Sequence, residues 1–185
     1  APRRRRPRTL SRGSGETSQA NAATGRRTSR PREAARVTQA DLRFEVLQSS
    51  HDRANFNSGS PALDEWFRLR ASQDQRRNVA QVFVAVASDR VVGFYSLSMF
   101  TLSLDTLPPA LAKKLPRYEA IPAAIIGRLA RAESARSTGL GDLLLADAIK
   151  RILSASETVA AYAIVVDAKD ERGKRFYEEH GFIAL

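Results

Sequence analysis

The segment spanning residues 123–153 constrains the fold more than any other part of the chain. It begins with an apolar run, AAIIGRLARA, that is typical of a buried strand. A short turn containing Gly139 and Gly141 follows, and an amphipathic helix comes after it. This order of strand, glycine turn and helix predicts a strand–helix unit in which the helix packs on a sheet.

The rest of the chain from residue 39 predicts further strands and helices. We expect strands at 43–47, 79–87, 91–104, 123–132 and 160–168, helices at about 60–73, 141–153 and 170–180, and the start of a last strand at 182–185. Ser88-Asp89-Arg90 reads as a short turn that makes a hairpin of two strands. The order predicts an α/β (α+β) fold with a mixed, mostly antiparallel sheet and helices on both faces.

The charge of the chain divides it into two parts. Residues 1–38 hold 11 Arg and 2 acidic residues, a net charge of +9, whereas residues 39–185 hold 19 Lys and Arg and 18 Asp and Glu, a net charge of +1. We expect a basic disordered tail over 1–38, because it lacks the apolar residues that a core needs, and one domain over 39–185. A polyanion-binding arm and a transit peptide are the two alternatives for the tail.

Composition excludes several classes of site. The absence of cysteine excludes disulfides, thiolate metal sites and a cysteine nucleophile. The only two histidines, His51 and His180, are far apart in sequence, so we expect no metal. No apolar run reaches the roughly 18 residues of a membrane span, and we expect no membrane association.

The glycine turn, from Arg136 to Gly141, has the features of an anion site. Glycine lets the backbone approach a ligand closely, and the free N–H groups at the start of a helix point at one spot. A pyrophosphate fits such a site, and Arg136 can add a charge-assisted hydrogen bond. A plain turn between strand and helix is the alternative, because RxxGxG alone is a weak signal.

From this strand through the glycine turn to the helix, the chain resembles the GNAT N-acetyltransferases, whose acetyl-CoA signature is a strand, [QR]xxGxG/A and a helix. The resemblance covers roughly 42–185. Four further blocks, SPALDEWFRLRASQDQRRNVAQVFV, VVGFYSLS, LPRYEAIPAAIIGRLA and VVDAKDERGKRFYEEHGF, look like the toxins of GNAT toxin–antitoxin modules. The resemblance implies a cytoplasmic toxin that uses acetyl-CoA to acetylate the α-amino group of aminoacyl-tRNA and so blocks translation. It also implies a ribbon-helix-helix antitoxin, DNA binding by the complex and a possible homodimer.

The resemblance assigns roles to particular residues. Tyr177 matches the family's tyrosine general acid, and we expect Lys174 or Arg175 to lower its pKa by stabilising the phenolate. A bulge of the fourth strand near Leu129–Arg131 would free N–H groups for the acetyl carbonyl. The implied coenzyme-binding residues are Leu129, Ala130, Arg131, Arg136, Ser137, Thr138, Gly139, Leu140, Gly141 and Asp142.

A run of arginines on and after the first helix is the candidate tRNA contact. Its members are Arg68, Arg70, Arg76 and Arg77, with Arg128, Arg131, Lys113 and Lys114 as candidates to extend it. A solvated helix face is the alternative. We interpret Trp66 as a core residue, His180 as the end of a helix, His51 as solvated, and Asp167 and Asp170 as caps of the last helix.

The sequence departs from the family pattern after residue 181. Family members continue through one more strand beside the fifth, and that C-terminal strand is expected to be missing here. Two alternatives to the tRNA-acetylating toxin therefore stay open: an acetyltransferase for a small amine or a protein N-terminus, and a truncated, inactive GNAT-like binding protein.

Overall fold

The structure is a computed structural model that describes residues 41–113 and 118–184. Its helices and strands are β1 (Arg43–Val46), α1 (Pro61–Leu69), α2 (Ala71–Arg76), β2 (Gln81–Ala87), β3 (Arg90–Ser103), η2 (Leu104–Thr106), α3 (Pro109–Ala112), β4 (Ala120–Arg131), η3 (Glu133–Ala135), α4 (Leu140–Ser156), β5 (Ala163–Val166) and α5 (Glu171–Glu179), of which η2 and η3 are 3-10 helices. The predicted tail, 1–38, lies outside the described residues, as does Lys114.

The strands form one mixed sheet in the order β1-β2-β3-β4-β5. The first four are antiparallel neighbours, and β5 runs parallel to β4. The predicted turn joins β2 to β3 through Ser88 and Asp89, both with positive φ (48° and 58°), as in a type I′ turn. The predicted fold class is therefore confirmed.

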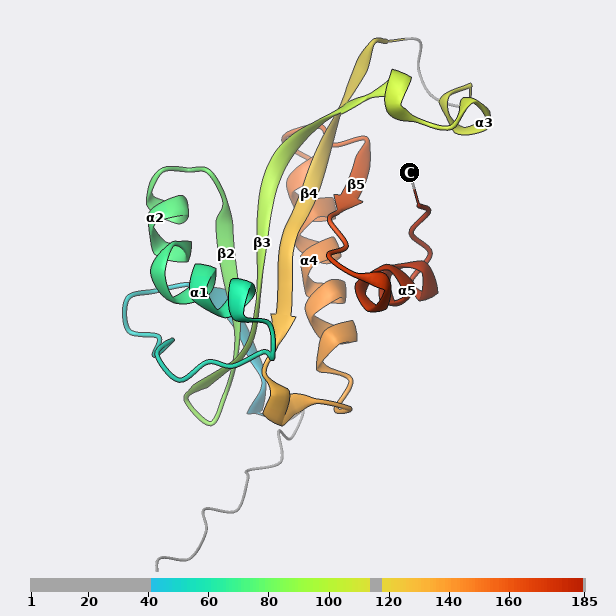
Figure 1. Cartoon of the computed structure of the whole chain (residues 1–185). Coiled ribbons are helices and arrows are strands. Elements are labelled where there is room, and N and C mark those ends of the chain that lie inside the picture. The colour runs from blue at the N-terminus through green and yellow to red at the C-terminus, as the bar shows by residue number, and fades with distance from the viewer. Residues whose placement is uncertain (1–40, 114–117, 185) are drawn as a thin grey trace, which may run out of the picture. The chain divides into compact units, whose positions relative to one another are not determined.

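Helices cover both faces of this sheet (Figure 1). On one face, α1 and α2 pack against β2 and β3, and Phe67 stacks on Phe94 with 4.1 Å between ring centres. On the other face, α4 and α5 enclose a second core, which includes Tyr95, Leu144 and Tyr177. Helix α4 is thereby fixed to the sheet along its apolar face, which sets the position of its N-terminus.

Three expectations about the elements are wrong in detail. The first predicted helix is two helices, because the chain changes direction at Arg70. The indole Nε1 of Trp66 donates a hydrogen bond to Asp74 Oδ2 at 2.9 Å. On a continuous helix these two residues would lie about 12 Å apart along the axis.

The strand predicted over 160–168 spans only Ala163–Val166 and is half-buried, since β4 is its one partner among the described strands.

The strand predicted at 182–185 is also wrong over residues 182–184, which are irregular, while Leu185 lies outside the described residues. Gly181, with φ of +85°, ends α5, and the backbone N–H of Phe182 donates to Tyr177 O at 3.1 Å. The Phe182 ring then packs on the Tyr177 ring, and the backbone does not form a strand beside β5. Within the described part of the chain, no helix is long and apolar enough to cross a membrane.

Candidate active site

Strands β4 and β5 separate halfway along β4. They pair only between Ala123–Ile126 and the four residues of β5, although β4 runs on to Arg131. Alternate residues of a strand direct their N–H and C=O groups toward the neighbouring strand position. From Gly127 to Arg131 no described strand occupies that position, so this edge of β4 presents backbone donors and acceptors to a cleft.

A β-bulge marks the point of separation. Ser96 pairs with Arg128 and Leu97 with Ile126, so Gly127 faces no residue of β3. The predicted bulge is therefore present, but it lies before Leu129–Arg131 rather than within it. Sequence reasoning could not fix the register of β3 on β4, which decides where the extra residue falls.

The glycine turn begins α4 at the end of this cleft. Gly139 is the N-cap and has φ of +75°, as expected for glycine, and no side chain caps the helix. The first N–H groups of α4 are therefore free for an external acceptor. Gly141 does not need the conformational freedom of glycine, since its φ is not positive, and an added Cβ would be in ordinary contact with the Phe176 ring at 3.5 Å.

Basic side chains from three elements gather around the cleft. Burial and the nearby charges of Arg172 and Arg136 lower the pKa of Arg131, which shows that these cations are close enough to repel one another. Arg136 is half-exposed and pairs with Glu133 at 2.8 Å. A concentration of positive charge beside the free amides of α4 suits a phosphate-bearing ligand.

The cleft between β4 and α5 has a volume of about 280 Å³. It brings together the predicted residues Leu129, Ala130, Arg131, Arg136, Gly141 and Tyr177. It also includes Lys169 and Arg172, which sequence reasoning missed because only the docking of α5 beside β4 brings them there.

The other predicted coenzyme residues lie outside the lining of the cleft. Leu140 is buried in the core, and Thr138 donates to the carbonyl of Ala135 at 2.8 Å. The carboxylate of Asp142 lies 3.4 Å from His180 Nε2. Ser137, with φ of +62°, shapes the turn. Leu140 can therefore reach a ligand only through its backbone.

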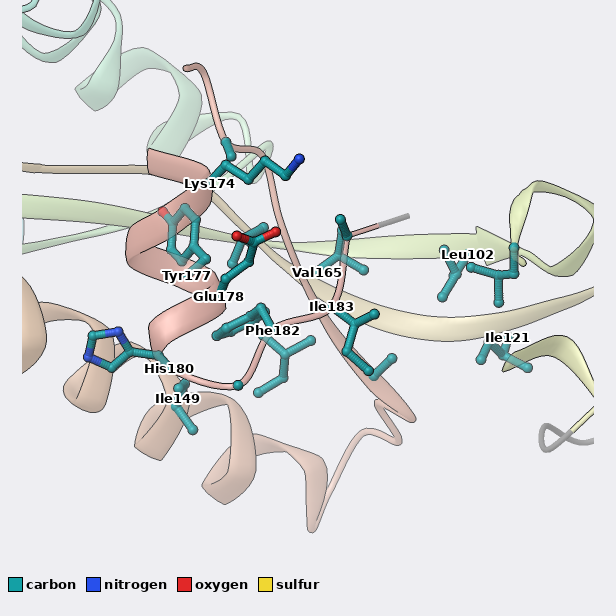
Figure 2. A pocket seen from close by; sticks show the side chains of 17 residues that line it. Leu102, Ile121, Ile149, Val165, Lys174, Tyr177, Glu178, His180, Phe182 and Ile183 are labelled. Carbon is teal, nitrogen blue, oxygen red and sulfur yellow. The ribbon is translucent and has the colours of Figure 1, made fainter. Parts of the chain in front are cut away.

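Tyr177 lies in α5, and its side chain is buried. Burial, and next the Asp167 carboxylate, raise its pKa to about 12. The expectation that Lys174 or Arg175 lowers this pKa is wrong; in Figure 2 the Lys174 side chain extends away from the phenol oxygen. Among the described residues the hydroxyl has no hydrogen-bond partner, so it is available to a ligand. At neutral pH Tyr177 is a proton donor.

Tyr177 also lines a second cavity, of about 750 Å³, between β5 and the C-terminal end of α5 (Figure 2). Most of its lining is apolar, including Leu102, Ile121 and Ile183. The described groups contain no cluster of three or more side chains that could hold a metal ion.

The predicted arginines of α1 and α2 are all exposed; they are Arg68, Arg70, Arg76 and Arg77. Arg53, which sequence reasoning missed, lies close enough to Arg76 for that charge to lower its pKa, after the larger effect of burial. Trp66 is buried, as predicted for a core residue. Arg128 lines the cleft, whereas Lys113 is exposed and does not line it.

Comparison with known proteins identifies the fold. Residues 78–184 match the family model described as an acetyltransferase (GNAT) domain. The chain belongs to the GNAT family of acetyltransferases. A tRNA-acetylating toxin of Mycobacterium tuberculosis is 31% identical over 136 residues, which cover 74% of this chain and 81% of that protein. A probable toxin TacT of Sinorhizobium fredii is 29% identical over 144 residues, with 73% and 80% covered.

Solved structures of GNAT toxins are similar as well. AtaT complexed with acetyl-methionyl-tRNAfMet has a TM-score of 0.71 and 29% identity, covering 77% of this chain and 87% of AtaT. AtaTR bound with acetyl-CoA has a TM-score of 0.70 and 28% identity, covering 79% and 88%. The AtaT–AtaR complex bound to DNA has a TM-score of 0.63 and 26% identity, covering 77% and 86%.

Proposed function

We propose that this protein is an acetyl-CoA-dependent N-acetyltransferase that acetylates the α-amino group of aminoacyl-tRNA and so acts as a toxin of translation. One observation carries the proposal: a single cleft is lined by Arg136 and Gly141 of the glycine turn, by the edge of β4 from Gly127 to Arg131 and by Tyr177. The similarity to the tRNA-acetylating toxin of Mycobacterium tuberculosis and to AtaTR bound with acetyl-CoA supports it.

The residues of the cleft fit the coenzyme. The free amides at the start of α4, from Gly139 to Asp142, would hold its diphosphate, and Arg131, Arg136 and Arg172 would neutralise the phosphate charge. The open edge of β4 would bind the amide groups of the pantetheine arm as a neighbouring strand does. Bound acetyl-CoA would supply a thioester that an amine can attack.

The backbone of β4 would polarise the acetyl carbonyl. Alternate N–H groups between Gly127 and Arg131 face the side of β4 that has no described strand partner, so they can serve as preorganised donors. One such donor contributes about 2.7–4 kcal/mol to transition-state stabilisation in acyl transfer. The acceptor needs little help, since an α-amino group has a pKa near 8 and an adjacent ester lowers it further.

Tyr177 would complete the transfer as general acid. As the C–N bond forms and the C–S bond breaks, its hydroxyl gives a proton to the departing sulfur and recovers one from the attacking nitrogen. A phenol with a pKa of about 12 is a weaker acid than a thiol, by about 3.5 pH units or roughly 5 kcal/mol. Tyr177 therefore donates in concert with the proton that arrives from the amine.

The experiment is acetyl transfer from radiolabelled acetyl-CoA to a mixture of charged tRNAs. We expect label on the amino acid, and we expect Tyr177→Phe to reduce kcat about 10²- to 10⁴-fold with unchanged coenzyme A binding. Tyr162→Phe is the matched control, because Tyr162 is 53% exposed and lies outside the cleft. Charge reversal at Arg76 and Arg77 should lower the rate on tRNA.

The remaining outcomes separate the rival functions. Coenzyme binding with no transfer to charged tRNA, but transfer to a small amine or a protein N-terminus, would favour the alternative enzyme. Absence of coenzyme binding would favour a binding protein without catalysis. If cells expressing Tyr177→Phe are poisoned as strongly as those expressing the wild type, the enzymatic account of toxicity is wrong.

We extend the proposal to the surroundings of the enzyme. The partners are aminoacyl-tRNA and a ribbon-helix-helix antitoxin, with a homodimer as the form of the toxin and DNA as the ligand of the toxin–antitoxin complex; the AtaT–AtaR complex bound to DNA supports this. The site of action is the cytoplasm, where charged tRNA is used. The acetyltransferase domain is 39–185, and 1–38 is a basic segment outside it.

A further inference from the structure

Arg128 is a fixed cation in the wall of the cleft. Its Cζ atom lies 4.2 Å from the centre of the Trp66 ring, so the guanidinium covers the indole. The side chain is half-buried and lines the same cleft as Tyr177. Among the described side chains no carboxylate forms an ion pair with it. Arg128 is therefore a positive charge in a fixed position, and none of the described side chains neutralises it.

Trp66 is itself immobilised. It is only 6% exposed, and its Nε1 donates to Asp74 Oδ2 at 2.9 Å. The ring also packs 5.8 Å from the ring of Phe94. An arginine that stacks through its flat face keeps its N–H groups, which lie in the guanidinium plane, free for a bidentate contact with an oxyanion. The stacking thus fixes the orientation of the Arg128 guanidinium and leaves its N–H groups free to bind an oxyanion.

The bulge separates Arg128 from the other cations of the cleft. After Gly127, Arg128 and Ala130 face the α1 side of the sheet, where Ala130 joins the core of α1 and α2. Arg131 instead lies near Arg136 and Arg172, at the end of the cleft where α4 begins. The cleft is therefore lined by cations from both faces of the sheet, and the coenzyme's diphosphate accounts only for those beside α4.

We propose that Arg128, positioned by Trp66, binds the 5′-phosphate of the terminal adenosine of aminoacyl-tRNA. This inference rests on the proposed function, since the terminal adenosine carries the amino acid. Its 5′-phosphate is the anion nearest to the ester, and the α1 side is left for the acceptor when the coenzyme occupies the α4 end. The exposed Arg68 of α1 and Arg70, which follows α1, would contact phosphates further along the tRNA.

The test compares two small acceptors that differ only in this phosphate: 3′-aminoacyl-adenosine 5′-phosphate and 3′-aminoacyl-adenosine. The wild type should use the phosphorylated acceptor with a kcat/KM about 10- to 100-fold higher, as expected for a hydrogen bond to a charged group. Arg128→Gln should abolish this preference by raising KM for the phosphorylated acceptor toward the KM for the unphosphorylated one. Arg128→Lys should restore part of the preference, and Trp66→Phe should weaken it.

Two controls keep the test specific. Arg90→Gln removes one exposed positive charge elsewhere on the sheet and should leave the preference intact. Coenzyme A affinity by calorimetry should equal that of the wild type for Arg128→Gln, which shows that the variant is folded. An equal loss on both acceptors, or an unchanged preference, would overturn the proposal.

If the proposed function itself is wrong, the result differs from the one that overturns the role of Arg128. In that case the wild type acetylates neither acceptor. Binding of a fluorescent aminoacylated minihelix then decides the role of Arg128, because loss of one phosphate contact lowers the slope of log Kd against log salt by about one. A lowered slope for Arg128→Gln would support the phosphate contact without acetylation, and an unchanged slope would overturn it.

Discussion

The hydroxyl of Tyr95 donates a hydrogen bond to the carboxylate of Asp147, and this partly buried contact ties β3 to α4. Arg151 binds the same carboxylate at 2.8 Å and reaches the carbonyl of Phe44 in β1 at 3.3 Å. Burial, with the Asp147 carboxylate next, raises the pKa of Tyr95, so the phenol stays protonated as the donor. The pair therefore fixes the helix whose N-terminus forms one end of the cleft.

Replacing Tyr95 by Phe should destabilise the protein without affecting coenzyme binding. The variant leaves Asp147 with one partner fewer, and a buried hydrogen bond to a charged group contributes about 1.5–3 kcal/mol. Asp147 lies about 12 Å along α4 from Gly139, so the free amides should keep their positions. Urea denaturation measures the first effect and calorimetry with coenzyme A the second. Tyr118→Phe is the control, since Tyr118 is 70% exposed.

Gly93→Ala should destabilise the same helix–sheet contact. An added Cβ would lie 2.9 Å from Leu144 Cδ1 and 3.2 Å from the Ala130 carbonyl oxygen. Overpacking of this kind costs about 1–3 kcal/mol. Gly173→Ala is the comparison, because its nearest contact would be 3.4 Å and alanine favours a helix. The explanation is wrong if both variants unfold at the same urea concentration.

The sequence predicts the strand, the glycine turn and the cap of α5 because these depend on local patterns. Asp170 is the N-cap, as expected, whereas Asp167 instead pairs with Lys169 at 2.5 Å. The bulge at Gly127 could not be located, because it depends on which residues of β3 lie opposite β4. The roles of Arg172 and of Arg128 on Trp66 depend on segments far apart in the chain, and no local pattern encodes them.

Asp170→Ala should loosen α5 and with it Tyr177. The carboxylate accepts a hydrogen bond from the backbone N–H of Gly173 at 2.7 Å. Loss of an N-cap costs about 0.5–2 kcal/mol. Asp170→Asn keeps the acceptor and should lose much less stability in thermal melting. Equal losses for the two variants would show that charge, and not capping, is what Asp170 contributes.

The rate of the reaction should not fall through deprotonation of Tyr177 at any pH below about 11. The phenol is active when protonated, and its pKa is raised to about 12, so activity that depends on this proton is lost only as pH rises through that value. The rate should instead rise through the pKa of the acceptor amine, near 8 or below, and then stay level. An acceptor with an amide in place of the ester avoids hydrolysis at high pH. A fall in kcat/KM centred at pH 10 or lower in the wild type, and absent from the residual activity of Tyr177→Phe, would contradict the raised pKa.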